Sequence, residues 1–153
     1  MIASLPFALL LLQTPQTPPK PAVAAPAPAV AQGPYEFATE LGVFLIVVKS
    51  DKAAAFDAAM ARLRQVLVAS TDKTRKLQAS SWRVLKSAED PTDGAITYLW
   101  LIDPVAKTAS YDPIAILKEL SPADVQLVYD QLQSSIVSIT RLGLKELLKM
   151  GGL

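Results

Sequence analysis

The segment from Leu41 to Val48 reads LGVFLIVV, and it constrains the fold more than any other part of the chain. Aliphatic and aromatic side chains fill it without a polar interruption, and Lys49 ends it. A short run of this kind is typical of a β-strand that is buried on both faces. The fold must therefore provide cover for two faces of the sheet that contains this strand.

An amphipathic helix is predicted directly after this strand, from about residue 52 to residue 69. Four large apolar side chains recur there at helical spacing and share one helix face: Phe56, Met60, Leu63 and Leu67. Residues 50–51 supply a capping oxygen and an acid at the helix start. The apolar stripe could line a ligand pocket, but packing in a core is the preferred interpretation. The polar stretch 70–78 that follows is interpreted as a loop.

A β-hairpin is predicted next. Residues 82–87 (WRVLKS) alternate as in a half-buried strand, and residues 95–102 (AITYLWLI) form the second strand. The turn between them lies at residues 89–94, which contain a proline and an Asp-Gly pair.

The register of this hairpin stays open from the sequence alone. In one register Arg83 faces Trp100, and Trp82 lies on the opposite face. A register shifted by one residue places Trp82 on the same face as Tyr98 and Trp100. In both registers the sheet carries large side chains on its two faces, which favours cover of the second face by a dimer partner.

The last third of the chain predicts two helices and a strand. Asp112 and Pro113 open a short helix that ends at Leu120, and residues 121–124 open a longer one. Residues 137–144 (VSITRLGL) could continue that helix, but their β-branched side chains favour a strand that begins near Val137. Residues 145–150 are expected to add a helical turn.

The order of these elements is strand, helix, strand, strand, helix, strand. This order predicts an α+β fold of the ferredoxin-like βαββαβ type, with an antiparallel sheet and helices on one face. We expect residues 35–153 to form this single domain.

The arrangement resembles the dimeric α/β-barrel superfamily, which includes domains similar to antibiotic-biosynthesis monooxygenases. The resemblance rests on the two-helix connection at residues 112–136 after an aromatic strand, and it covers about residues 40–147. It implies a homodimer in which two sheets meet face to face, with ligands held between sheet and helices. No signature motif of the family is present, so the resemblance assigns no catalytic residue.

The N-terminal region predicts export. Residues 1–12 form an apolar segment typical of a signal peptide, with cleavage expected after Ala31 in a small-x-small site. Seven of the twelve prolines lie in residues 13–34, which are interpreted as a Pro/Ala-rich linker. The apolar run is too short to span a bilayer. We therefore expect a periplasmic or secreted protein without a stable membrane span.

The residue types that the chain lacks exclude several classes of site. The sequence contains no His, Cys or Asn, and its net charge is +1. Zinc sites, His-dependent catalytic triads and proximal-His haem sites are therefore excluded. The charge balance does not favour nucleic-acid binding. We expect no metal and no cofactor, and no residue is assigned a catalytic role.

Five residues are the candidate lining of a pocket for a small apolar ligand: Trp82, Arg83, Tyr98, Trp100 and Tyr111. Packing in the core or in a dimer interface is the preferred interpretation of the same residues. Three functions follow from these patterns. The first is an exported dimeric binding or interaction domain without catalysis. The others are a cofactor-independent enzyme acting on an apolar substrate and a structural subunit of an envelope assembly.

Overall fold

The computed structural model describes residues 33–148 and 150–151. The predicted signal segment 1–12 and the linker up to residue 32 lie outside the described residues. Four strands form one antiparallel sheet in the order β2-β3-β1-β4. Their bounds are β1 (Leu41–Lys49), β2 (Trp82–Lys86), β3 (Ala95–Ile102) and β4 (Ile136–Leu144).

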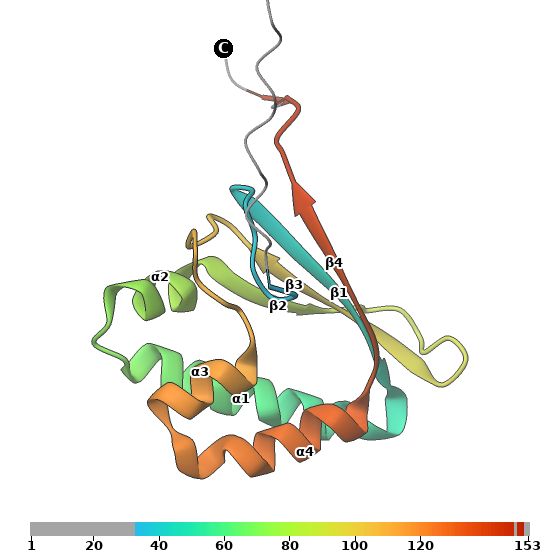
Figure 1. Ribbon diagram of the computed structural model, residues 1–153. Coiled ribbons are helices and arrows are strands. Elements are labelled where there is room, and N and C mark those ends of the chain that lie inside the picture. The colour runs from blue at the N-terminus through green and yellow to red at the C-terminus, as the bar shows by residue number, and fades with distance from the viewer. Residues whose placement is uncertain (1–32, 149, 152–153) are drawn as a thin grey trace, which may run out of the picture. The chain divides into compact units, whose positions relative to one another are not determined.

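The helices lie on one side of this sheet (Figure 1). They are α1 (Ala53–Ala69), α2 (Lys73–Ser81), α3 (Pro113–Leu120) and α4 (Val125–Ser135), with short 3-10 turns η1 (Ser50–Lys52) and η2 (Pro122–Asp124). The α+β class and the four-stranded antiparallel sheet are confirmed, and both are compatible with a ferredoxin-like fold. The strand predicted near Val137 is also present, and it begins at Ile136.

Helix α2 corrects the prediction of a loop at residues 70–78. Its start is capped by Asp72, whose carboxylate accepts a hydrogen bond from the Arg75 backbone N–H at 2.9 Å. Partners distant in sequence hold the helix, since Arg75 pairs with Glu119 of α3 and the Gln78 side-chain amide donates to the Ser110 carbonyl. Helix α2 has no apolar stripe, and these polar contacts hold it in place instead.

The helical turn predicted at residues 145–150 is also wrong. Residues 145–148 follow β4 without regular structure, and Leu147 is 93 % exposed. A single helical turn fixes several backbone angles for very few hydrogen bonds. Leu147 and Leu148 remain exposed, so this segment buries too little apolar surface to stabilise a turn.

The hairpin between β2 and β3 adopts the second of the two registers considered above. Arg83 lies opposite Leu101 and Val84 opposite Trp100, so Trp82 shares a face with Tyr98 and Trp100. At the loop tip, Asp93 and Gly94 have φ angles of 51° and 71°. Two successive left-handed residues are the requirement of a tight hairpin turn that matches strand twist, and the Asp-Gly pair meets it.

The sheet face that the helices cover contains the aromatic core. Phe44, Tyr98 and Trp100 are each 1 % exposed. The Phe56 ring of α1 lies 4.5 Å from the Tyr98 ring, and Phe44 meets Trp100 edge-on at 5.6 Å between ring centroids. This packing confirms that the predicted stripe of α1 faces the core.

The opposite side of the sheet, here called the open face, is also apolar. Alternate residues of the strands point to it, and cross-strand pairs such as Leu45 with Leu99 and Val43 with Leu142 place them side by side. The apolar residues of the open face are Leu41, Val43, Leu45, Val47, Leu85, Leu99, Leu101, Leu142 and Leu144, and the same side carries Arg83, Thr97, Ser138 and Thr140. Leu45, Leu85 and Leu142 are 37 %, 44 % and 40 % exposed. No described helix packs over this side (Figure 1).

Candidate functional site

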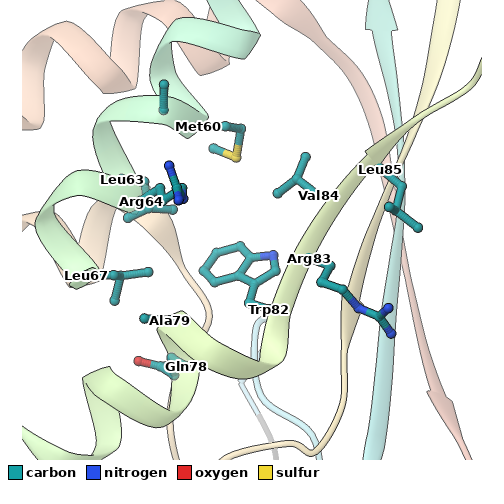
Figure 2. A pocket seen from close by; sticks show the side chains of 11 residues that line it. Met60, Leu63, Arg64, Leu67, Gln78, Ala79, Trp82, Arg83, Val84 and Leu85 are labelled. Atoms are coloured by element: carbon teal, nitrogen blue, oxygen red, sulfur yellow. The ribbon is translucent and has the colours of Figure 1, made fainter.

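Four of the five predicted pocket residues pack against one another on the helix-covered side of the sheet. The Trp82 ring meets Trp100 edge-on at 4.9 Å and Tyr111 at 5.5 Å, while Tyr98 lies next to Phe56 of α1. Arg83 is separated from them, because it points to the other side of β2 (Figure 2). The role of the five residues in ligand binding stays a prediction.

Two kinds of buried polar group, a phenol hydroxyl and two indole N–H groups, define the chemistry of this cluster. The Tyr111 hydroxyl accepts a hydrogen bond from the Ala106 backbone N–H at 2.8 Å, and burial raises the pKa of this phenol. The indole N–H groups of Trp82 and Trp100 are buried and find no hydrogen-bond partner among the described residues. A protonated phenol and two indoles supply packing surface and hydrogen-bond donors, and none of them acts as a base at neutral pH.

A groove lies between helix α1 and strand β2, and Trp82 forms part of its wall (Figure 2). We call it the β2 groove, and its volume is about 430 Å³. It is lined by Met60, Ala61, Leu63, Arg64 and Leu67 of α1, Gln78 and Ala79 of α2, and residues 82–85. Figure 2 shows Trp82 and Val84 pointing toward α1, whereas Arg83 and Leu85 point away.

Sequence reasoning found part of this groove. The stripe of α1 was considered as a pocket lining, and Met60, Leu63 and Leu67 of that stripe do line the groove. The contribution of Gln78 is not predicted, because residues 70–78 are interpreted as a loop, and Ala79 lies just after that stretch, outside any predicted element. Arg64 was missed because it lies off the apolar stripe, and only its position one turn after Met60 could have indicated its place at the rim.

A polar cluster joins α1 to both strands of the hairpin. The Tyr98 hydroxyl donates to Asp57 Oδ1 at 2.8 Å, and Lys86 Nζ lies 3.2 Å from Asp57 Oδ2. The pKa of Tyr98 is raised overall, because the effect of burial exceeds the opposing effect of Lys86. The hydrogen bonds of Lys86 with Tyr98 and Asp57 raise the pKa of Lys86. Tyr98 and Lys86 therefore stay protonated at neutral pH, and the cluster acts as a tie between elements.

The five arginines divide into two groups, and all of them lie within the described residues. Arg62 pairs with Asp124 and Arg75 with Glu119, while Arg141 donates to the carbonyls of Gly33 and Glu36 at 2.6 and 2.7 Å. Arg64 and Arg83 have no hydrogen-bond or ion-pair partner within residues 33–148 and 150–151. Arg64 lines the groove from α1, whereas the Arg83 side chain points to the other side of β2, so Arg64 supplies the unpaired positive charge on the groove side.

Over the range that the structure describes, no group of three acidic, His or Cys side chains could hold a metal ion. Within the same range no helix is long and apolar enough to cross a bilayer. With an apolar groove, unpaired guanidinium groups and protonated phenols, the site is suited to binding. No protein-family model matches the chain, and no curated protein or solved structure shows significant similarity to it.

Proposed function

We propose that this chain is an exported interaction domain without catalytic activity, and that it forms a homodimer through the open face of its sheet. The observation that carries the proposal is the apolar character of this face, on which Leu45, Leu85 and Leu142 remain more than one third exposed. Contiguous exposed apolar patches on soluble domains mark interaction sites. A second copy is the simplest partner, because the same face on both chains is complementary to itself.

The size of the open face supports a dimer. Strands about 4.8 Å apart with about eight residues rising about 3.3 Å each give this sheet a face of roughly 500 Å². Two such faces in contact bury roughly 1,000 Å², which reaches the lower bound of a specific interface. Stacked sheets pack about 10 Å apart, so leucine and valine side chains fill the space between them.

The distribution of polar side chains on this side of the sheet also supports a dimer. Thr97 of β3 and Ser138 of β4 lie opposite Val47, at one end of the sheet. Arg83 and Thr140, the latter opposite Leu45, lie on the two edge strands β2 and β4. The central positions Leu45 and Leu99 are apolar. An apolar centre with a polar rim is the usual anatomy of a protein interface.

The test is the molar mass of the purified protein by size exclusion with light scattering. Leu45→Asp places a charge at the centre of the open face, and Leu127→Asp is the matched control on α4, where Leu127 is 58 % exposed. We expect a dimer for the wild type and the control, and a folded monomer for Leu45→Asp. A wild-type monomer at micromolar to millimolar concentration would overturn the proposal.

Export is the second part of the proposal, and it is supported by the apolar segment 1–12 and the linker 13–34. N-terminal sequencing of the protein recovered outside the cytoplasm tests it. We expect a new N-terminus at Gln32 if cleavage follows Ala31. Recovery of the intact chain from the cytoplasm alone would exclude export.

A further inference from the structure

Strand β2 is an edge of the sheet, and its main chain has free hydrogen-bonding groups. At its two ends the Asp103 N–H donates to the Ser81 carbonyl at 3.0 Å and the Ser87 N–H donates to the Thr97 carbonyl at 2.9 Å. The main-chain groups of Ser81 and Ser87 therefore point toward β3. In an antiparallel ladder the residues between them alternate, so the N–H and C=O of Val84 point to the free edge.

The β2 groove runs along this edge. Helix α1 lies on the far side of the groove and contributes Met60, Leu63 and Leu67, while β2 contributes Val84, which is 42 % exposed (Figure 2). One turn beyond Arg64, Val68 is 62 % exposed on the same helix. A bare strand edge next to an apolar helix face has room for a short extended chain, and its alternate side chains would enter the groove.

The positive charge beside the groove indicates that the molecule bound there carries a negative charge. Arg64 lines the groove and has no acidic partner in the described part of the chain, whereas Arg62 on the same helix is paired with Asp124. A guanidinium group next to an apolar surface gains most from a carboxylate partner, because the planar fork of donors matches it.

We propose that the β2 groove binds an extended, acidic peptide segment of a partner protein, which adds to the sheet as a strand beside β2. The peptide main chain pairs with the N–H and C=O of Val84. Its inward side chains are apolar and contact Met60 and Leu67, and a carboxylate pairs with Arg64. Strand addition is an established mode of peptide recognition. A small apolar molecule fits the groove but leaves the Val84 groups unpaired, which is why we favour a peptide. This site goes beyond the proposed function, since it uses the edge of the sheet and leaves the open face untouched.

The test begins with a displayed library of random hexapeptides, selected on the full chain. A peptide from the selection is then labelled, and its affinity is measured by fluorescence polarisation. We expect enrichment of sequences with apolar residues at alternate positions and at least one acid. A library without enriched sequences would overturn the proposal.

Two variants of one residue separate main-chain pairing from side-chain packing. Val84→Pro removes the edge N–H, which the sheet itself does not use, and proline is tolerated on edge strands. Val84→Ala is the matched control, because it shortens the side chain and keeps the N–H. We expect about tenfold weaker peptide binding for Val84→Pro than for Val84→Ala. Arg64→Gln should weaken binding severalfold at low salt and less at high salt. The oligomeric mass should stay unchanged in all three.

A probe modified in its own backbone keeps the test decisive if Val84→Pro fails to fold. Two versions of the selected peptide are compared, one N-methylated at its odd-numbered amides and one at its even-numbered amides. One version should lose binding and the other should keep it, because only every second amide faces β2. Equal tolerance at all amides would overturn strand addition. Decanoate, a small apolar carboxylate, serves as competitor, and complete competition together with that tolerance would assign the groove to small molecules.

Discussion

The two faces of the sheet are made by alternate residues of the same strands, and they differ in what covers them. On one face Phe44, Tyr98 and Trp100 are sealed by α1, α3 and α4. On the other face Leu101, Val43 and Leu142 line up across three strands, Leu45 lies beside Leu99, and no described element packs over them. Both faces are mainly apolar, but the aromatic side chains of the strands (Phe44, Trp82, Tyr98 and Trp100) all lie on the helix-covered face, whereas the apolar side chains of the open face are aliphatic.

This difference shows that apolar content alone does not locate the core of one chain. The run at residues 41–48 carries the pattern of a strand buried on both sides, and the described part of the chain supplies helices for only one side. The aromatic face needs geometric fit with rings and helices inside one chain. The aliphatic face carries leucine and valine side chains without large rings and can pack against an identical surface. The predictions below test whether the two faces differ in this way.

The largest effect is expected from Phe44→Ala on the helix-covered face. Phe44 contacts the rings of Tyr35, Phe37 and Trp100, so its loss leaves a cavity that the core cannot close. We expect a loss of about 3–5 kcal/mol in the free energy of unfolding, measured by urea titration. The loss should appear at every protein concentration. A loss that appears only in dilute samples would mean that this face, too, is stabilised by association.

The next effect is expected from Gly42→Ala, also on the helix-covered face. A Cβ atom at Gly42 would lie 2.7 Å from the Phe37 ring, which is closer than packed atoms approach. Displacing this ring should cost about 1–3 kcal/mol in the free energy of unfolding. Gly143→Ala on β4 is the matched change, because its nearest neighbour is the small side chain of Thr39 at 2.9 Å. Equal costs for both variants would show that the Phe37 ring can move freely.

A smaller effect, of a different kind, is expected from Leu45→Ala, one residue away from Phe44. Leu45 is already 37 % exposed in the single chain, so its truncation should change monomer stability little. A dimer loses this contact twice, and we expect its dissociation constant to rise about tenfold. Analytical ultracentrifugation over a dilution series measures this change. An unchanged constant would place the interface elsewhere.

The smallest effect is expected in the pH dependence of stability, tested with the variant Asp124→Asn. Arg62, with help from the Ser121 hydroxyl, holds the pKa of Asp124 below its usual value. The folded pKa lies below the unfolded one, so this pair stabilises the fold above the unfolded pKa, and the contribution is lost as pH falls through the folded value. The stability difference between wild type and Asp124→Asn should therefore be small at about pH 6 and should decrease as the pH falls through the lowered pKa of Asp124. The open face contains no carboxylate, so Asp124→Asn should leave the dissociation constant of the dimer unchanged at about pH 6. A change in that constant would link the helix layer to the interface.

The sequence predicted the order of the strands and of the longer helices from an uninterrupted apolar run at residues 41–48, the alternation at residues 82–87, the stripe of α1 and the β-branched side chains of residues 137–144. It missed α2, whose stability depends on Arg75 and Gln78 meeting partners from a segment more than thirty residues away. It also left the hairpin register open, because Arg83 and Trp82 could each be placed on a face with large side chains. Of the β2 groove the sequence indicated only the apolar stripe of α1, since the groove is formed where the edge of one strand lies beside that helix.

The hydrogen bonds of Arg141 to the carbonyls of Gly33 and Glu36 tie the first described residues to strand β4. The Tyr111 N–H also donates a hydrogen bond to the Tyr35 carbonyl at 2.8 Å. A force applied through the preceding segment would therefore enter the domain at the sheet. It would load the β1–β4 ladder before it reached α1, whose contacts lie on the other side of the aromatic core. If the segment acts as a tether, the mechanically weakest point of the domain is this clamp, and Arg141→Gln should lower the force at which the first residues peel away.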